Sequence, residues 1–146
     1  MKELSGREKQ IINERIRKLE DLKKQGIEPY PNKFDKKDLC SEATNKKLDS
    51  EIKTAGRLIS KRELGKIAFG KIRDSSGELQ IVLQKEKTPE PQMQLFKKYI
   101  DSGDFVGVKG KIIKTKTGEK SVLVETIKIL SKSIRPLPEK WHGLQD

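Results

Sequence analysis

Several residue types are scarce in this sequence, and each scarcity excludes a class of protein. The 146 residues include one cysteine, Cys40, and one histidine, His142. A single cysteine cannot form an internal disulfide, and its presence fits a reducing compartment. One cysteine and one histidine far apart in the chain argue against a zinc site, which needs several such ligands. We therefore expect neither a disulfide-stabilised scaffold nor a metal centre.

Long hydrophobic segments are also missing. No run of about 18 apolar residues occurs, so nothing in the sequence is expected to span a membrane. The chain is polar from Lys2 onward and lacks the apolar core of a signal peptide. These absences predict a cytosolic protein without a membrane partner.

Recognisable catalytic motifs are absent too. Gly65-Lys66 and Gly110-Lys111 are both followed by isoleucine, so neither begins the Gly-Lys-Ser/Thr end of a phosphate-binding loop. A Ser/His/Asp set cannot be built with one histidine near the C-terminus. The residues themselves therefore indicate no catalytic site.

Positive charge, by contrast, is abundant. Charged residues make up 38% of the chain and hydrophobic residues 32%, and 33 basic residues outnumber 22 acidic ones to give a net charge of +11. Such an excess favours a polyanionic partner and makes binding depend on salt. A soluble, lysine-rich protein without such a partner would show the same balance, so charge alone leaves both interpretations open.

The first 50 residues predict a helix and a connecting segment. Ser5-Gly-Arg-Glu8 has the spacing of a capping box, and a helix should run from there to about Gln25, where Gly26 ends it. Its apolar stripe consists of Ile12, Ile16 and Leu19, with Ile11, Arg15 and Leu22 beside it. This helix is either a solvated element that docks by its apolar stripe or a basic arm that touches nucleic acid. Residues 29–50 are polar, with a short helix expected near 41–48.

From residue 51 the pattern changes to strands. Strands are predicted at residues 52–60, 67–73, 79–84, 104–114 and 120–130, with one helix at 88–99. Glycines inside the strands, Gly56, Gly107 and Gly110, suggest the sharp bends of a small closed sheet. Three strands, a helix and two strands are the order of an OB-fold, a mainly β, five-stranded Greek-key barrel. We divide the chain into residues 1–50, a barrel at 51–131 and a linker at 132–146.

Strand parity places one aromatic residue outside the barrel. One face of the second strand holds only small or apolar residues, Ala68, Gly70 and Ile72. The other face carries Ile67, Phe69, Lys71 and Arg73. Because successive side chains point to opposite faces, Phe69 is expected among cations on the outer surface. The alternative is a core phenylalanine whose parity is shifted by a bulge.

Other candidate contacts surround Phe69. Gln80 lies between inward-facing residues of the third strand and should also point outward, where an amide can read base edges. Lys61 and Arg62 lie near the turn between the first two strands, and Glu119 lies in the turn between the last two. A carboxylate repels phosphate, so Glu119 would instead accept a hydrogen bond from a base. Each of these residues could equally be an ordinary exposed residue without a role in binding.

Several segments of the sequence resemble those of a known family. The segments that carry the resemblance are Ala55-Gly-Arg-Leu-Ile-Ser-Lys-Arg-Glu-Leu-Gly-Lys66, Ala68-Phe69, Arg73-Asp74, Leu79-Gln80, Lys114-Thr-Lys-Thr-Gly-Glu119 and Arg135-Pro-Leu-Pro-Glu-Lys-Trp-His-Gly-Leu-Gln-Asp146. They are similar to the N-terminal region of bacterial-type class II lysyl-tRNA synthetases, and the similarity covers nearly the whole chain. Aspartyl- and asparaginyl-tRNA synthetases share the barrel but differ in the final segment.

The resemblance implies a function and a set of contacts. The barrel would read the uridine-rich anticodon of lysine tRNA, with Phe69 as the stacking ring. Gln80, Arg62 and Glu119 match the family's base-reading glutamine, arginine and loop glutamate, and the N-terminal helix would approach the tRNA. Catalysis with ATP and magnesium would belong to a domain beyond Asp146, so no cofactor is expected here. A full-length enzyme would be a homodimer and this segment a monomer.

Two rival functions stay open on the sequence alone. The chain could be a free-standing barrel that binds single-stranded nucleic acid without sequence preference. It could also be a protein-interaction module whose basic charge is incidental.

Overall fold

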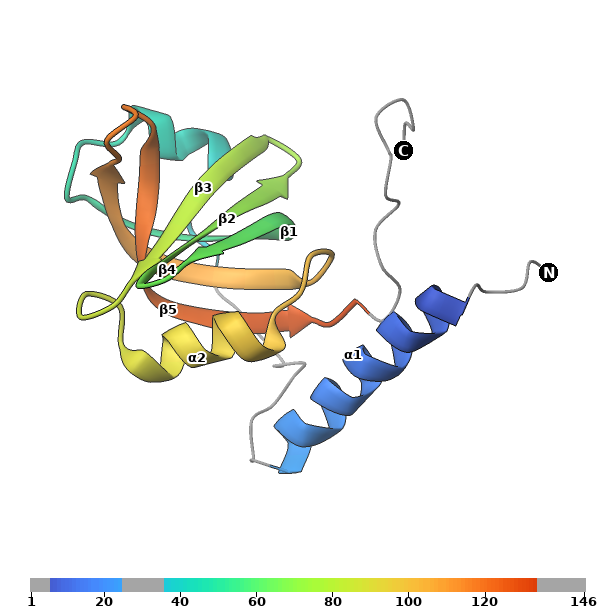
Figure 1. Cartoon of the computed structure of the whole chain (residues 1–146). Helices are drawn as coiled ribbons and strands as arrows, with labels where there is room; N and C mark the ends of the chain where they lie inside the picture. The colour runs from blue at the N-terminus through green and yellow to red at the C-terminus, as the bar shows by residue number, and fades with distance from the viewer. Residues whose placement is uncertain (1–5, 25–35, 134–146) are drawn as a thin grey trace.

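The computed structural model describes residues 6–24 and 36–133 and contains a closed β-barrel with a helix at its side (Figure 1). The elements in chain order are α1 (Gly6–Lys24), the 3-10 helix η1 (Cys40–Asn45), β1 (Glu51–Leu64), β2 (Ile67–Asp74), β3 (Gly77–Gln84), α2 (Glu90–Tyr99), β4 (Phe105–Lys114) and β5 (Lys120–Ser131). The strands close in the order β1-β2-β3-β5-β4. The predicted five-stranded barrel, with a helix between its third and fourth strands, is confirmed.

The pairing of the strands explains how the sheet closes. β1 pairs with β2 along its second half and with β4 along its first half, and β3 closes the barrel by a parallel pairing with β5. A Cβ at Gly56 would lie 2.6 Å from the carbonyl oxygen of Arg73, and one at Gly110 would lie 2.1 Å from that of Leu123. These two strand glycines are therefore required where backbones cross closely.

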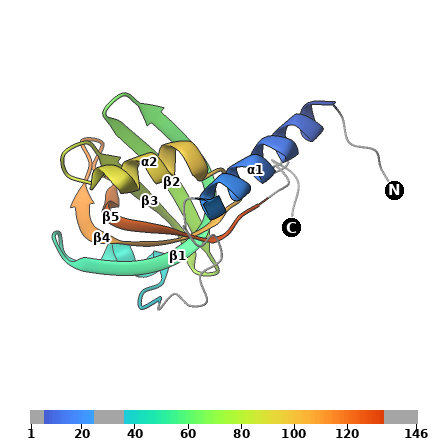
Figure 2. The same cartoon turned by 90° about the horizontal axis from the view of Figure 1, so that it is seen from below.

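The core fills the barrel and is closed by α2. Alternate strand residues such as Ile72 and Ile81 point inward and are fully buried. From α2, Phe96 and Met93 enter the same core, and the Phe96 ring reaches the backbone of Gly70. Two views show α2 lying across one end of the barrel (Figures 1 and 2). Helix α2 therefore supports the strands of the barrel through the core.

The segment before β1 is tied to the β2–β3 turn. Asp74 accepts hydrogen bonds from the Lys36 ammonium at 2.7 Å and from the backbone N–H of Cys40 at 2.9 Å. Burial raises the pKa of Asp74, but these donors and Ser76 outweigh it and hold the pKa well below the usual range. Cys40 itself is buried, and burial raises the pKa of its thiol to about 11, so the thiol stays protonated at neutral pH.

Helix α1 is buried most deeply along the line beside the predicted stripe, while Ile12 and Leu19 of the stripe itself are half-buried. Leu22 is fully buried and Arg15 nearly so, whereas Ile16 is 39% exposed. The line through Arg15 and Leu22, expected beside the stripe, is thus the centre of the docked side. Lys18 and Asp21 on the same side contact Asp101 and Tyr99 at the end of α2. The predicted cap at Ser5 lies outside the described residues.

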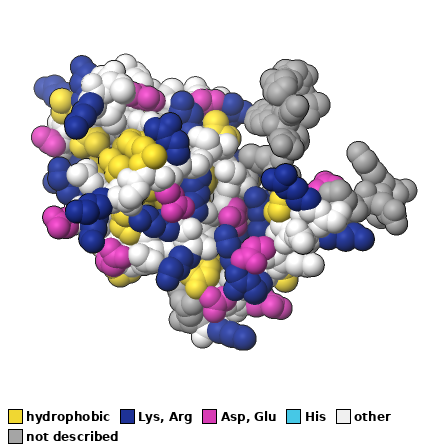
Figure 3. All heavy atoms as spheres, viewed as in Figure 1, with side chains coloured by type: hydrophobic (Ala, Val, Ile, Leu, Met, Phe, Trp, Pro, Cys, Tyr) yellow, Lys and Arg dark blue, Asp and Glu magenta, His cyan; other side chains and the backbone are white. Residues whose placement is uncertain are grey.

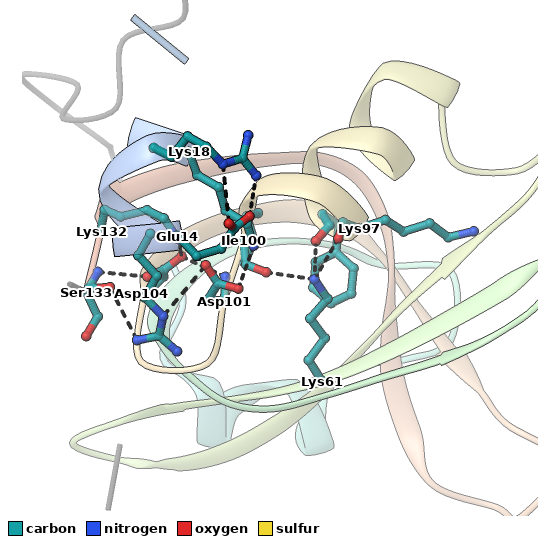
Figure 4. A network of polar contacts seen from close by, with 12 residues as sticks. Glu14, Lys18, Lys61, Lys97, Ile100, Asp101, Asp104, Lys132 and Ser133 are labelled. Carbon is teal, nitrogen blue, oxygen red and sulfur yellow. Dashed lines mark hydrogen bonds and ion pairs between the residues drawn. The ribbon is translucent and has the colours of Figure 1, made fainter. Parts of the chain in front are cut away.

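A cluster of charges, here called the junction cluster, joins α1 to the barrel. It consists of Lys18 of α1, Asp101 and Asp104 before β4, and Lys132 after β5 (Figure 4). The ammonium of Lys132 lies 2.7 Å from a carboxylate oxygen of Asp101 and 2.7 Å from one of Asp104, and the side chains of Lys132 and Asp104 are fully buried. Lys132, the first residue of the predicted linker, thus belongs to this cluster, whereas residues 134–146 lie outside the described part.

The junction cluster lowers the pKa of one of its carboxylates, Asp101. Burial raises the pKa of Asp101, but hydrogen bonds from Lys132 and Lys18 outweigh this effect, so the pKa lies below its ordinary value. The ionised form is therefore the one that the folded protein stabilises. Within the residues described, no helix is long and apolar enough to cross a membrane.

Candidate nucleic-acid interface

A groove of about 1060 Å³ runs across the outer face of β1, β2 and β3 and is bounded by the β4–β5 turn. Its lining residues include Arg62, Lys66, Phe69, Lys71, Gln80, Val82, Gln84, Lys87, Lys114, Thr115, Lys116, Thr117 and Leu123. In the space-filling view, hydrophobic side chains gather on the barrel face toward the viewer, with lysine and arginine side chains around them (Figure 3). An apolar surface with a cationic rim suits bases that stack and phosphates that need neutralising.

Phe69 lies in this groove, as strand parity predicted. Ala68 and Ile72 on the opposite face are fully buried in the core, while the Phe69 ring is partly exposed. Arg62 is its cross-strand partner on β1, and the Arg62 guanidinium carbon lies 5.7 Å from the ring centroid. On the other side Phe69 pairs with Val82, which is 1% exposed. The ring is thus held on an apolar base, beside a cation, with one side open to a ligand.

A shift of register in β1 places Arg62 next to Phe69. The pairing of β1 with β2 shifts between Leu58 and Ser60, so Ile59 is an extra residue in β1. Leu58 points into the core opposite Ile72, but three residues past Ile59 Arg62 points outward opposite Phe69. A one-residue bulge reverses the inward and outward sense of a strand. Without it, Arg62 would share the inner face with Leu58.

The same bulge turns Lys61 inward. The Lys61 ammonium donates hydrogen bonds to the carbonyl oxygens of Phe96 at 2.7 Å, Lys97 at 3.0 Å and Ile100 at 2.7 Å (Figure 4). Burial lowers the pKa of Lys61, partly offset by attraction to Glu63. Although Lys61 borders the groove, its charge caps the C-terminal carbonyls of α2. The sequence had suggested a nucleic-acid contact, and the structure gives this ammonium an internal role instead.

Gln80 reaches the groove from β3, next to Lys71 of β2. Its side-chain oxygen Oε1 accepts a hydrogen bond at 2.7 Å from the hydroxyl of Ser121, its partner on β5. Ser121 is fully buried, so its hydroxyl bonds the amide of Gln80 from the side that faces the protein interior. The amide and the Phe69 ring border the same groove.

Two predicted residues do not line the groove. The Arg73 guanidinium is paired with Glu78, its cross-strand neighbour, through Nε at 3.1 Å. Glu119 is exposed in the β4–β5 turn, where its backbone groups bond to Thr115. Of the seven predicted residues, the structure therefore gathers Arg62, Phe69, Lys71 and Gln80 around open space, places Glu119 in the β4–β5 turn outside the lining, and engages the charges of Lys61 and Arg73 in other contacts.

The rim contains residues that the sequence reasoning did not single out. Lys66 and Lys87 are exposed on one side of the groove, and Lys114 and Lys116 are exposed on the other. The turn that carries the second pair is shaped by Gly118, whose φ of 89° is in the left-handed region, and by a 3.0 Å contact between the hydroxyls of Thr115 and Thr117. We call these four residues the rim lysines. The repeated lysines around a turn were the only available signal.

A second pair of a phenylalanine and an arginine lies elsewhere on the barrel. Phe105 at the start of β4 is 45% exposed, and the Arg57 guanidinium carbon lies 5.7 Å from its ring centroid. Neither residue borders the groove. In the described ranges 6–24 and 36–133, no three His, Cys, Asp or Glu side chains are placed to hold a metal ion.

The closed barrel, with its groove on the β1–β3 face, defines a class of nucleic-acid-binding domain. The model of one family, described as the OB-fold nucleic acid binding domain and named for the tRNA anticodon, matches residues 52–130. The chain belongs to this OB-fold family, which confirms the predicted fold class.

The curated relatives are more particular. A lysine–tRNA ligase of Thermosipho melanesiensis is 43% identical over 148 residues, which cover 94% of this chain and 29% of the relative. Lysine–tRNA ligases of Dehalococcoides mccartyi and Thermotoga maritima are each 40% identical, over 95% and 94% of this chain. The chain is thus similar to lysine–tRNA ligases, as its motifs indicated, and spans 29% to 30% of their length.

Proposed function

We propose that this domain binds the anticodon loop of a tRNA, and that it does so as part of a lysine–tRNA ligase. The observation that carries this proposal is the groove itself: a partly exposed ring, an arginine and an oriented amide around one open space. The OB-fold family and the names of the relatives support a tRNA as the ligand. The net charge of +11 supports a polyanion.

In this proposal one base of the loop leaves the stack and lies on the Phe69 ring. A base–aromatic stack contributes about 1–3 kcal/mol. Arg62 and Gln80 contact the edge of that base, and Glu119 accepts from a neighbouring base. The rim lysines neutralise the phosphates on both sides of the groove.

The chemistry of the whole ligase is a further part of the proposal. Lysine activation with ATP and magnesium, homodimer formation and a cytoplasmic location are proposed for a longer protein of this kind. The residues of the barrel would supply tRNA recognition only, and the isolated domain would be a monomer without a cofactor. Helix α1 would lie beside the tRNA, because its outer face carries exposed cations such as Arg17, Lys23 and Lys24.

The test is a titration of the domain with two RNA stem-loops of equal length. One carries the lysine anticodon and the other an unrelated loop, and the salt concentration is varied. We expect tighter binding of the lysine loop and a strong decrease of affinity with salt. Equal affinity for both loops would favour a sequence-tolerant single-strand-binding barrel. Failure to bind either RNA at about 50 mM salt would favour a protein-interaction module.

A further inference from the structure

Ser121 is a buried hydroxyl directly beneath the groove. Its side chain is 0% exposed, so it cannot itself touch a ligand. Its hydroxyl donates to Gln80 Oε1 at 2.7 Å and lies 3.4 Å from the carbonyl oxygen of Glu119. Ser121 and Gln80 are paired across the parallel β3–β5 contact that closes the barrel. The hydroxyl thus connects the base-facing amide of β3 to the β4–β5 turn.

This bond gives the Gln80 amide a direction. A free glutamine can present either its carbonyl oxygen or its amino group to a ligand, because the two ends exchange by rotation. Here Oε1 is bonded to Ser121, while Gln80 lines the groove and its Nε2 has no acceptor among the described residues. Gln84, four residues further along β3, also lines the groove, but no described residue hydrogen-bonds its side chain. The side-chain amide of Gln80 is therefore held in one orientation by a hydrogen bond, whereas that of Gln84 is not.

We propose that Ser121 is a positioning residue that sets the base preference of the groove. With Oε1 occupied, Gln80 offers an N–H donor to the base stacked on Phe69. The 4-carbonyl of uracil can accept a hydrogen bond from this donor. Cytosine has a 4-amino group at the same position, which is itself a donor and cannot accept from the N–H of Gln80. The inference rests on the proposed binding of a stacked base at Phe69. It adds that the preference for uracil depends on a hydroxyl that the RNA never contacts.

The experiment measures a ratio of affinities. Two stem-loops differ only by uracil or cytosine at the stacked position, and they are titrated against the wild type, Ser121→Ala, Gln80→Ala and the double variant. We expect the wild type to prefer uracil by roughly fivefold or more. Each single variant should lose most of this preference. The double variant should lose no more than Gln80→Ala, because Ser121 acts only through Gln80.

Controls separate positioning from general stability. Thr88→Val removes another buried hydroxyl, in the segment between β3 and α2, which donates to the carbonyl of Val124, accepts from the backbone N–H of Gln84 and does not bond Gln80. It should lower the melting temperature but leave the uracil-to-cytosine ratio at the wild-type value. If Ser121→Ala does not fold, Ser121→Cys replaces the hydroxyl by a somewhat larger thiol that is only a weak donor, and it should likewise lose most of the preference for uracil.

A measurement on the wild type needs no variant. Side-chain amide ¹⁵N relaxation should show Gln80 more ordered than Gln84 in the free domain. Equal disorder of the two amides would overturn the inference. So would a Ser121→Ala variant whose ratio of uracil-loop to cytosine-loop affinity equals that of the wild type. The third contradicting result is a double variant that loses the sum of the two single losses of preference. If the wild type still prefers the lysine anticodon loop, those outcomes do not contradict the proposed function of anticodon-loop binding. A wild type that binds neither loop would overturn both proposals.

Discussion

The groove and the junction cluster use the same kind of residue in opposite ways. In the junction cluster, the ammonium of Lys132 lies between Asp101 and Asp104, away from water. At the groove, the rim lysines are exposed and surround a partly exposed aromatic ring. This contrast shows that a lysine-rich composition does not by itself indicate whether the lysines stabilise the fold or bind a ligand. Carboxylates on both sides make Lys132 structural, whereas no described carboxylate forms an ion pair with a rim lysine, which leaves the rim lysines available to a polyanion.

The two regions should also differ in energetic role. Removing one partner of a buried ion pair leaves the other charge uncompensated, so the junction cluster should dominate stability. Exposed cations contribute little to the free energy of unfolding but can contribute to the affinity for RNA. Stability and binding are therefore expected to respond to different lysines.

The largest effect is expected at the junction cluster. Lys132→Met should lower the free energy of unfolding by about 3–5 kcal/mol, because the fully buried Asp104 carboxylate loses its cation. The matched control is Lys128→Met, four residues earlier on β5, where the side chain is exposed. Urea unfolding of both variants checks this. A decrease below about 1 kcal/mol for Lys132→Met would show that the cluster is not structural.

A smaller effect, visible in binding alone, is expected at the rim. The double variant Lys66→Gln/Lys87→Gln should reduce the slope of log affinity against log salt by about 0.7 for each phosphate that is no longer neutralised. Its free energy of unfolding should stay close to that of the wild type. Lys128→Gln is the control outside the groove and should leave the slope unchanged. An unchanged slope in the double variant would remove these lysines from the interface.

The smallest effect concerns acid stability. The pKa of Asp101 in the folded protein lies below its ordinary value, so its ionised form stabilises the fold above that ordinary value. This contribution disappears as pH falls through the folded pKa. Asp101→Asn should therefore be less stable than the wild type at neutral pH, and the difference should shrink as the pH falls below the ordinary pKa of an aspartate. Urea unfolding at several pH values would contradict this if the difference were constant.

Much of the barrel could be predicted because its signals are local. Alternating apolar residues marked the strands, and Ala68, Gly70 and Ile72 on one face indicated that Phe69 lies on the other. Both signals depend only on the two-residue period of a strand. For the same reason the prediction of Gln80 as outward-facing agrees with its position in the groove.

The remaining features depend on distant contacts. The extra residue Ile59 is defined only by pairing with β2, so the inward turn of Lys61 was not readable from β1 alone. The docking of α1 depends on Lys18 meeting Asp101, 83 positions away. The rim lysines were indistinguishable among 33 basic residues until the fold brought them to one groove.

The central claim is that the groove, and not basic charge in general, binds RNA, and two phenylalanines test it directly. Phe69 and Phe105 each lie beside an arginine at 5.7 Å, but only Phe69 borders the groove. Titration with the lysine anticodon stem-loop should show affinity about tenfold weaker for Phe69→Ala and unchanged for Phe105→Ala. Equal affinity of Phe69→Ala and the wild type would contradict the account.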